Sequence, residues 1–349
     1  MRFFVGGYTG HVYSAELDTT NGAMTITGSA KVAENASFLR YAPQLSTLYG
    51  TAETGNTGGE SGSILAWRVH DDGTLSAIGS CSSCGSAPCH IAVNTEHRLL
   101  TAANYGGGNF LAIELARDGS FGRQTSCVQH SGSSVNPDRQ EGPHVHGTTI
   151  SPDRQNVFVC DLGIDRILRY GVPQLRAGTD VAGSVAASLR PGAGPRHLTF
   201  SHDGKFAYVV TELANTVVAY AYDASRAELT PLQEISVLPE DYDGANTAAE
   251  LQIHPSDGFL YVSNRGHDSI AVFRRDRSTG ILEAGGHVSS GGSGPRHFQI
   301  EGGGRWCLVA NQFSDITSSF RIDGQTGMAH ATGYTLTSTA PSCVEFCEA

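Results

Sequence analysis

Short apolar runs alternate with polar turns along the whole chain. In one stretch, the polar turn HDGK precedes the apolar run FAYVV at 206–210, and a polar loop separates this run from TVVAYAYD at 216–223. A further turn, DASRAE, leads into a last strand. Runs of this length, bounded by Gly, Asp, Asn and Pro, predict four short antiparallel strands that follow one another as a meander.

This group of four strands recurs along the sequence. GPRHLTFSHDGKFAYVVTEL and GPRHFQIEGGGRWCLVANQF follow one template, and further segments fit it more loosely. The units begin at Glu34, Ala87, Gly142, Gly194, Ala248, Gly294 and Ala340. A spacing of about 50 residues is typical of propeller blades. The repeat therefore predicts an all-β, seven-bladed β-propeller of four-stranded antiparallel blades, in preference to a ring of six or eight.

The last unit contains one strand, APSCVEF, before the sequence ends. Residues 1–33 contain three runs, FFVGGY, HVYSAELD and AMTITGSAKV, and lack an inner strand. The two ends of the chain are therefore predicted to complete one blade together, which closes the ring and leaves no unpaired strand edge. On this interpretation, residues 1–349 form a single propeller domain.

The blade geometry sorts the polar residues. The innermost strand of a blade runs away from one face of the ring, and the second strand returns to that face. Residues just before the innermost strand and just after the second strand therefore meet on the same face, near the axis. The starts of the inner strands contribute His90, His144, His146, Arg196, His197, Arg296 and His297. The ends of the second strands contribute Glu53, Asn104, Tyr105, Asp161, Glu212, Asn264, Arg265, Asn311 and Gln312. One face is thus predicted to hold a polar funnel.

Arginine and histidine give this funnel its predicted chemistry. Guanidinium groups bind carboxylate or phosphate through paired hydrogen bonds, and His with Glu can transfer protons near neutral pH. An alternative is that Gly-Pro-Arg-His is a feature of the repeat, in which Arg ties one blade to the next. We favour function for His146, Arg196, Glu212 and Arg265, because they come from three successive blades and share no structural role.

Composition narrows the class of ligand. Charged residues make up 16% of the chain, which has 43 Gly and a formal net charge of -11. Such a protein is not expected to bind nucleic acid or an anionic membrane through a broad basic surface. No secretory signal and no apolar run of about 18 residues is present, which predicts a cytoplasmic protein without a membrane span.

Eight cysteines are too sparse for a disulfide scaffold, so most are expected to be free thiols. Cys81, Cys84, Cys89 and His90 resemble a group of metal ligands. No second cluster accompanies them, and we prefer to interpret this segment as a Gly/Ser-rich connection with small thiols. Neither a metal nor another cofactor is predicted.

The strings GPRHLTFSHDGKFAYVVTEL, SNRGHDSIAVF, PHVHGTTISPDRQNVFVCDLGIDRILRY and APSCVEF resemble the seven-bladed propeller lactonase family. That family includes bacterial 6-phosphogluconolactonases and fungal 3-carboxy-cis,cis-muconate cyclases. The resemblance covers essentially the whole chain and implies a metal-independent lactonase or lactonising enzyme. It also implies a site of one His, two Arg and one Glu, matched here by His146, Arg196, Glu212 and Arg265.

Two segments depart from the family pattern. They are the thiol-rich connection CSSCGSAPC and the segment ETGNTGGES at Glu53–Ser61, which would narrow or cover the mouth of the funnel. Because both segments differ from the family, the family resemblance does not fix which lactone this protein binds. The oligomeric state, monomer or dimer, is left open by the sequence.

Hydrolysis of a sugar lactone needs a base, a positive charge near the carbonyl oxygen and an anchor for a distal phosphate. His146 or Glu212 can be the base, and Arg196 and Arg265 can divide the other two roles. The remaining residues expected to contact an anionic lactone are His144, His197, Asn104, Tyr105, Asp161, Asn264 and Arg296. Neither a G-x-S-x-G nor an H-E-x-x-H motif is present.

We rank a lactonase first, a cycloisomerase second and a binding scaffold third. Surfaces that bind protein partners are rich in exposed aromatic residues, whereas Arg, His, Glu and Asn dominate this funnel.

Overall fold

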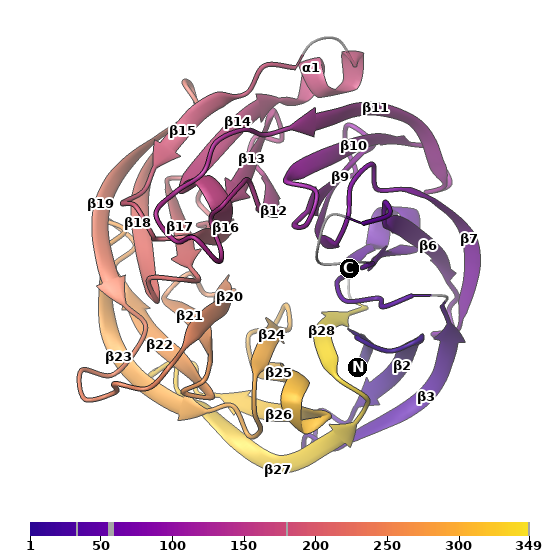
Figure 1. Cartoon of the computed structure of the whole chain (residues 1–349). Coiled ribbons are helices and arrows are strands. Elements are labelled where there is room, and N and C mark those ends of the chain that lie inside the picture. Colours follow the sequence, from indigo (N-terminus) through magenta and orange to yellow (C-terminus); the bar gives the residue numbers. More distant parts are fainter. Residues whose placement is uncertain (33, 55–58, 179–180, 348–349) are drawn as a thin grey trace.

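The computed structural model describes residues 1–32, 34–54, 59–178 and 181–347. In these residues, seven four-stranded antiparallel sheets are arranged around a central axis (Figure 1). The innermost strand of each sheet lies at the axis and the outermost strand lies at the rim. The predicted seven-bladed β-propeller is therefore confirmed.

The blades follow the chain, from the inner to the outer strand. The first three are β4 (Leu39–Ala42), β5 (Thr47–Ala52), β6 (Ser63–Val69) and β7 (Leu75–Ser82); β8 (Pro88–Asn94), β9 (Leu99–Asn104), β10 (Asn109–Leu115) and β11 (Phe121–Gln129); and β12 (Val145–Ile150), β13 (Asn156–Asp161), β14 (Arg166–Gly171) and β15 (Ser184–Ser188). The next three are β16 (Pro195–Phe200), β17 (Phe206–Thr211), β18 (Thr216–Asp223) and β19 (Glu228–Ser236); β20 (Thr247–Ile253), β21 (Phe259–Arg265), β22 (Ser269–Arg275) and β23 (Leu282–Ser289); and β24 (Pro295–Ile300), β25 (Trp306–Asn311), β26 (Ile316–Ile322) and β27 (Ala329–Thr337). Short helices lie in the connections between strands: η1 (Pro43–Leu45), η2 (Leu162–Ile164), α1 (Val172–Ala177) and η3 (Gln312–Ser314).

The seventh blade joins the two ends of the chain. Its inner strand, β28 (Pro341–Phe346), pairs antiparallel with β1 (Arg2–Gly7), and β2 (His11–Leu17) and β3 (Met24–Lys31) complete the sheet. Phe3 lies opposite Phe346 and Val5 opposite Val344. The predicted closure of the ring by both termini is confirmed.

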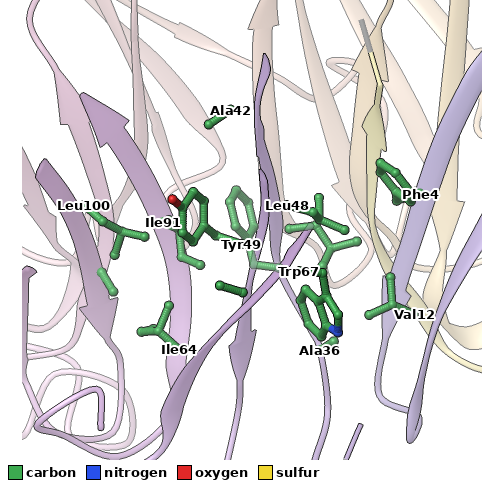
Figure 2. Close-up of a cluster of buried hydrophobic side chains, with 14 of the residues drawn as sticks. Phe4, Val12, Ala36, Ala42, Leu48, Tyr49, Ile64, Trp67, Ile91 and Leu100 are labelled. Atoms are coloured by element: carbon green, nitrogen blue, oxygen red, sulfur yellow. The ribbon is translucent and has the colours of Figure 1, made fainter. Parts of the chain in front are cut away.

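Apolar side chains between neighbouring blades form the core. Figure 2 shows one such cluster, in which Tyr49 and Trp67 pack among aliphatic residues. The Tyr49 hydroxyl donates a 2.6 Å hydrogen bond to the Gly119 carbonyl in the next blade. Tyr208 and Tyr261 make the equivalent bond to Gly280 and Gly327 at 2.9 and 2.6 Å. A buried tyrosine on the second strand thus ties three blades to their neighbours through a satisfied hydroxyl.

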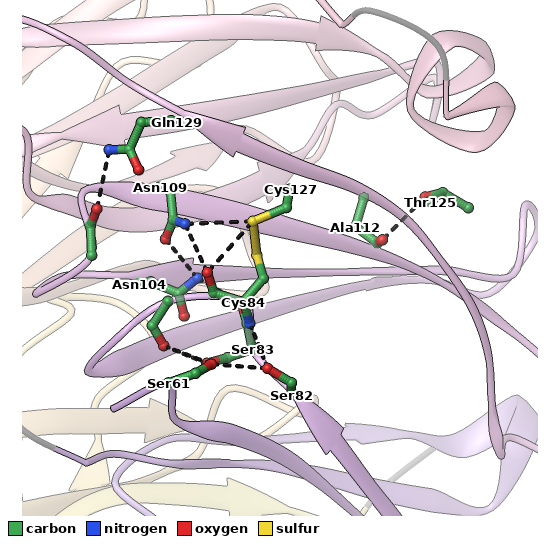
Figure 3. The surroundings of a disulfide bond; sticks show 12 residues. Ser61, Ser82, Ser83, Cys84, Asn104, Asn109, Ala112, Thr125, Cys127 and Gln129 are labelled. Carbon is green, nitrogen blue, oxygen red and sulfur yellow. Dashed lines mark hydrogen bonds between the residues drawn. A yellow bond between two sulfur atoms is a disulfide. The ribbon is translucent and has the colours of Figure 1, made fainter. Parts of the chain in front are cut away.

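The cysteines depart in part from expectation. Cys81, Cys89, Cys160, Cys307 and Cys343 are free thiols, but Cys84 forms a disulfide with Cys127 in β11 (Figure 3). This bond was not predicted, because 43 residues separate the two cysteines and only the folded blade brings them together. Cys84 therefore has no thiolate to offer to a metal.

No helix in the described ranges is long and apolar enough to span a membrane.

Candidate active site

A β-bulge sets the direction of the polar residues at the start of the inner strands. In β12, Val145 pairs with Asp161 and Gly147 pairs with Cys160, so His146 is the extra residue between two ladder positions. The same shift makes Arg196 the extra residue in β16 and Arg296 the extra residue in β24. A bulge re-aims a side chain that a regular strand would point elsewhere.

These bulges surround a cavity of about 570 Å³ near the axis. The residues that line it are Tyr8, Glu53, Cys89, Tyr105, Arg139, His146, Glu212, Thr247, Arg265, Arg296, Gln312 and Phe313. Most of these side chains are polar, and three are arginines. The cavity is therefore suited to a small, polar and anionic ligand.

One wall of the cavity is organised by Glu212, directly after β17. Its Oε1 accepts a 2.6 Å bond from Arg139 Nη2, and its Oε2 lies 3.1 Å from Arg196 Nε and 2.9 Å from Arg265 Nη2. Burial alone would favour the neutral acid, but the three guanidinium groups outweigh it and lower the pKa of Glu212 far below its usual value. Glu212 is thus a carboxylate at any pH near neutrality and a weak base.

His146 lies beside this carboxylate. Its Nε2 is 3.8 Å from Glu212 Oε2, and its Nδ1 is 3.9 Å from the Cys89 thiol. Burial, followed by the charge of Arg196, lowers the pKa of His146 well below 6.5. The imidazole is therefore neutral at pH 7.

The two arginines that share Glu212 Oε2 differ in their access to the cavity. Arg196 is 3% exposed, lies behind Glu212 and donates from Nη1 to the Ala249 carbonyl at 2.8 Å. Burial and the charge of Arg265 lower the pKa of Arg196 to about 10, so it remains a cation at neutral pH. Arg265 lines the cavity, and its Nη2 also donates to the Ala248 carbonyl at 3.2 Å.

The opposite wall is built from three blades: Glu53 comes from the first, Arg296 from the sixth and Tyr8 from the seventh. The Tyr8 hydroxyl donates to Glu53, at 3.1 Å from Oε1 and 3.0 Å from Oε2. The guanidinium carbon of Arg296 lies 5.4 Å from the centre of the Tyr8 ring. Phe313, which is 71% exposed, lies at the rim of this wall.

The predicted site residues fall into three groups: residues that line the cavity, two histidines outside the lining, and three fully buried residues that hold loops. His146, Glu212, Arg265, Arg296 and Tyr105 line the cavity, with Arg196 directly behind it.

His144 and His197 lie outside the lining. The His144 ring stacks on Tyr105 at 4.5 Å, and its Nδ1 contacts the Tyr105 carbonyl oxygen at 3.0 Å. His197 lines a second pocket, where its Nδ1 lies 2.8 Å from Glu250 Oε2.

Asn104, Asp161 and Asn264 are fully buried and also lie outside the lining. The amide groups of Asn104 and Asn264 donate to the carbonyls of Ser83 and Val237, each at 2.8 Å. Asp161 accepts from the backbone N–H of His144 at 2.8 Å and lies 2.7 Å from His130 Nδ1. These side chains hold the loops that enter the inner strands, so the repeat keeps a polar residue there for a structural purpose.

Sequence reasoning missed Arg139 and Tyr8. Arg139 lies in the loop between β11 and β12, which belongs to no repeated position, and it reaches both Glu212 and the Tyr105 hydroxyl. Tyr8 follows the first strand, so its place at the axis depends on the closure of the ring. The predicted cover at Glu53–Ser61 falls partly on residues 55–58, which lie outside the described residues, and that prediction stays untested.

Among the residues that the structure describes, no three His, Cys, Asp or Glu side chains are grouped so that they could hold a metal ion. Cys89 and His90 belong to different environments: Cys89 lines the cavity, and His90 stacks against Phe38 with ring centres 4.3 Å apart. The structure thus does not bring Cys81, Cys84, Cys89 and His90, which resemble metal ligands in sequence, together into such a group among the described residues.

Fold and site together define a class: a seven-bladed propeller with a cationic axial cavity that contains a neutral His beside a Glu. The family model described as Lactonase, 7-bladed beta-propeller matches residues 2–346, and the chain belongs to this family. It is 31% identical to the 6-phosphogluconolactonase of Bacillus subtilis, over 98% of this chain and 97% of that protein.

Two further relatives show the range of names in the family. The 6-phosphogluconolactonase of Formosa agariphila is 31% identical over 93% of both chains. The structure of the periplasmic gluconolactonase of Pseudomonas aeruginosa superposes with a TM-score of 0.89 at 31% identity, covering 99% of this chain and 98% of that one. Proteins named for a phosphorylated and for an unphosphorylated substrate are thus similarly distant from this chain.

Proposed function

We propose that this protein is a lactonase that hydrolyses a sugar lactone, with 6-phospho-D-glucono-1,5-lactone as the substrate and 6-phosphogluconate as the product. The observation that carries the proposal is the cavity in which the neutral His146 lies beside Glu212 and a cluster of arginines. The names of the relatives from Bacillus and Formosa support the choice of substrate.

In the proposed mechanism, His146 is the general base. Its imidazole accepts a proton from water while the water oxygen attacks the lactone carbonyl carbon. Glu212 lies 3.8 Å from Nε2 and stabilises the imidazolium that forms. Because arginines already occupy both oxygens of Glu212, we assign the proton transfer to His146, which lines the same cavity.

Arg265 stabilises the oxyanion in this mechanism. Its Nη1 group has no hydrogen-bond partner in the described part of the chain, and its guanidinium lines the cavity next to Glu212. The negative charge on the carbonyl oxygen develops only as the tetrahedral intermediate forms, so a fixed cation there favours the transition state. Arg196 is a positioning residue: it lies outside the cavity lining and forms an ion pair with Glu212 Oε2.

Collapse of the intermediate completes the reaction. The carbonyl re-forms, the bond between C1 and the ring oxygen breaks, and the imidazolium of His146 returns its proton to the leaving ring oxygen. One water molecule is added in total, and the product is an open-chain hydroxy acid. Each step uses groups of this chain and no other reactant besides water.

The test is a panel of lactones. Proton release would be followed with 6-phosphogluconolactone, glucono-1,5-lactone and carboxymuconolactone, each corrected for spontaneous hydrolysis, before and after treatment with EDTA. We expect turnover of the phosphorylated sugar lactone that EDTA does not abolish. Turnover of carboxymuconolactone alone would indicate a cycloisomerase, and no turnover of any lactone would contradict the proposal.

A further inference from the structure

Arg296 differs from the other arginines of the cavity in its partners. Arg139, Arg196 and Arg265 all form ion pairs with Glu212. Arg296 has neither an ion pair nor a hydrogen bond within the described residues, although its guanidinium lines the cavity. Arg296 is partly exposed to the cavity, and its five N–H donors have no acceptor among the described residues, so an anionic ligand can supply acceptors there.

The surroundings of Arg296 orient its guanidinium and keep it charged. The group stacks over the Tyr8 ring at 5.4 Å, a geometry in which the edge that carries the donors stays open. Tyr8 donates its hydroxyl to both oxygens of Glu53, so this carboxylate is hydrogen-bonded to Tyr8 and forms no ion pair with Arg296. Burial disfavours the cation, but the nearby carboxylates of Glu53 and Glu212 favour it, and the pKa of Arg296 is raised overall.

The charge of the cavity indicates the ligand. Four arginines line or back it, against Glu53 and Glu212, so it has an excess of two positive charges while His146 is neutral. A phosphomonoester carries about -1.5 to -2 at pH 7 and offers three acceptor oxygens. We propose that Arg296, stacked on Tyr8, anchors the phosphate group of the substrate. This inference rests on the proposed function and replaces the expectation that Arg196 or Arg265 has that role.

An anchor and an oxyanion donor make different kinetic predictions. A phosphate is charged in the ground state, so loss of its anchor weakens binding and raises KM. An oxyanion exists only near the transition state, so loss of its donor lowers kcat for every lactone. Glucono-1,5-lactone lacks the phosphate and therefore separates the two roles.

The experiment compares Arg296→Gln and Arg296→Lys with the parent on both lactones. The matched control is Arg305→Gln, which removes the same charge from an exposed position in the turn between β24 and β25, in the same blade. Binding of 6-phosphogluconate, the product, would be measured by calorimetry in parallel, since this needs no turnover. The lysine variant keeps the charge and loses the planar fork, which guards against failure of the glutamine variant to fold.

We expect Arg296→Gln to raise KM for the phosphorylated lactone and Kd for 6-phosphogluconate by about 10-fold to 100-fold, with Arg296→Lys between it and the parent. The constants of Arg296→Gln with glucono-1,5-lactone should change much less than those with the phosphorylated lactone, and all constants of Arg305→Gln should stay near parental values. An equal fall of kcat on both lactones, or unchanged product binding, would overturn the anchor. The two proposals can also fail separately. If the parent hydrolyses no lactone but binds 6-phosphogluconate, and Arg296→Gln weakens that binding, the proposed reaction is wrong and the anion site is supported.

Discussion

At the scale of single residues, the Glu212 carboxylate is the contact point of three arginines. The ion pairs at 2.6, 2.9 and 3.1 Å use both of its oxygens, and the residue is 3% exposed. The sequence predicted Glu212, Arg196 and Arg265 from their blade positions. It could not predict Arg139, because an arginine in an irregular loop has no periodic signal and is brought to the site only by the path of that loop.

Replacement of Glu212 by Gln should therefore affect both stability and activity. Three arginines would lose their counter-charge, which we expect to destabilise the fold by about 3–5 kcal/mol and to lower kcat by about 100-fold or more. Chemical denaturation and steady-state kinetics would measure both. The control, Glu234→Gln, breaks an exposed ion pair with Arg190 at 3.0 Å in the same blade and should cost less than about 1 kcal/mol. Equal effects of the two substitutions would contradict this account of Glu212.

The pH dependence of activity tests the state of His146. From residue type alone, the acid limb of kcat/KM would lie near 6.5. Burial and Arg196 lower the pKa of His146, so the neutral base persists to lower pH and the acid limb should shift below 6.5. Profiles would be recorded from pH 5 to 8 on both sugar lactones, because a substrate phosphate itself titrates near pH 6. Half-loss of activity at or above pH 6.5 on the unphosphorylated lactone would show that His146 is not the base in this state.

At the scale of the strand, the bulges explain what the repeat could and could not predict. The strings GPRH and PHVH located the starts of β16, β24 and β12. They did not reveal that His146, Arg196 and Arg296 are extra residues in the ladder, since a bulge depends on the pairing of two strands. The bulge separates Arg196, which contacts Glu212, from His197, which contacts Glu250 in a second pocket.

The Cys84–Cys127 disulfide should stabilise the second blade of the chain. It closes a loop across a sequence separation of 43 residues, for which chain entropy gives an upper contribution of about 4 kcal/mol. The double variant Cys84→Ser, Cys127→Ser should melt several degrees below the parent. Reductant should lower the melting temperature of the parent towards that of the variant and leave the variant unchanged. A parent that does not respond to reductant would argue against the bond.

At the scale of the whole molecule, the ring depends on the pairing of the two ends of the chain. The truncated last repeat predicted this closure, because one lone inner strand at the end of the sequence complements three outer strands at its beginning. All six residues of β28 are buried, and Val344 is among them. The closure also delivers Tyr8 to the cavity, since the Tyr8 backbone N–H bonds to the Ala340 carbonyl at 3.0 Å.

Removal of residues 340–349 should therefore open the ring. The edges of β1 and of the neighbouring inner strands would lose their partner, and we expect an aggregating protein without a cooperative melting transition. A chain that ends at Cys347 retains β28 and serves as the control. Size-exclusion chromatography and calorimetry would compare the two. A shortened protein that stays monodisperse and melts as the parent does would contradict closure by β28.

The most direct test of the account is the kcat of His146→Gln on 6-phosphogluconolactone, measured beside the parent and corrected for spontaneous hydrolysis. The control is His330→Gln, an exposed histidine on the outer strand β27. We predict that His146→Gln keeps the fold and the melting behaviour of the parent but loses about 100-fold to 10,000-fold in kcat, while His330→Gln retains the parental value. If His146→Gln keeps most of the parental kcat, the axial cavity is not the catalytic site that we propose.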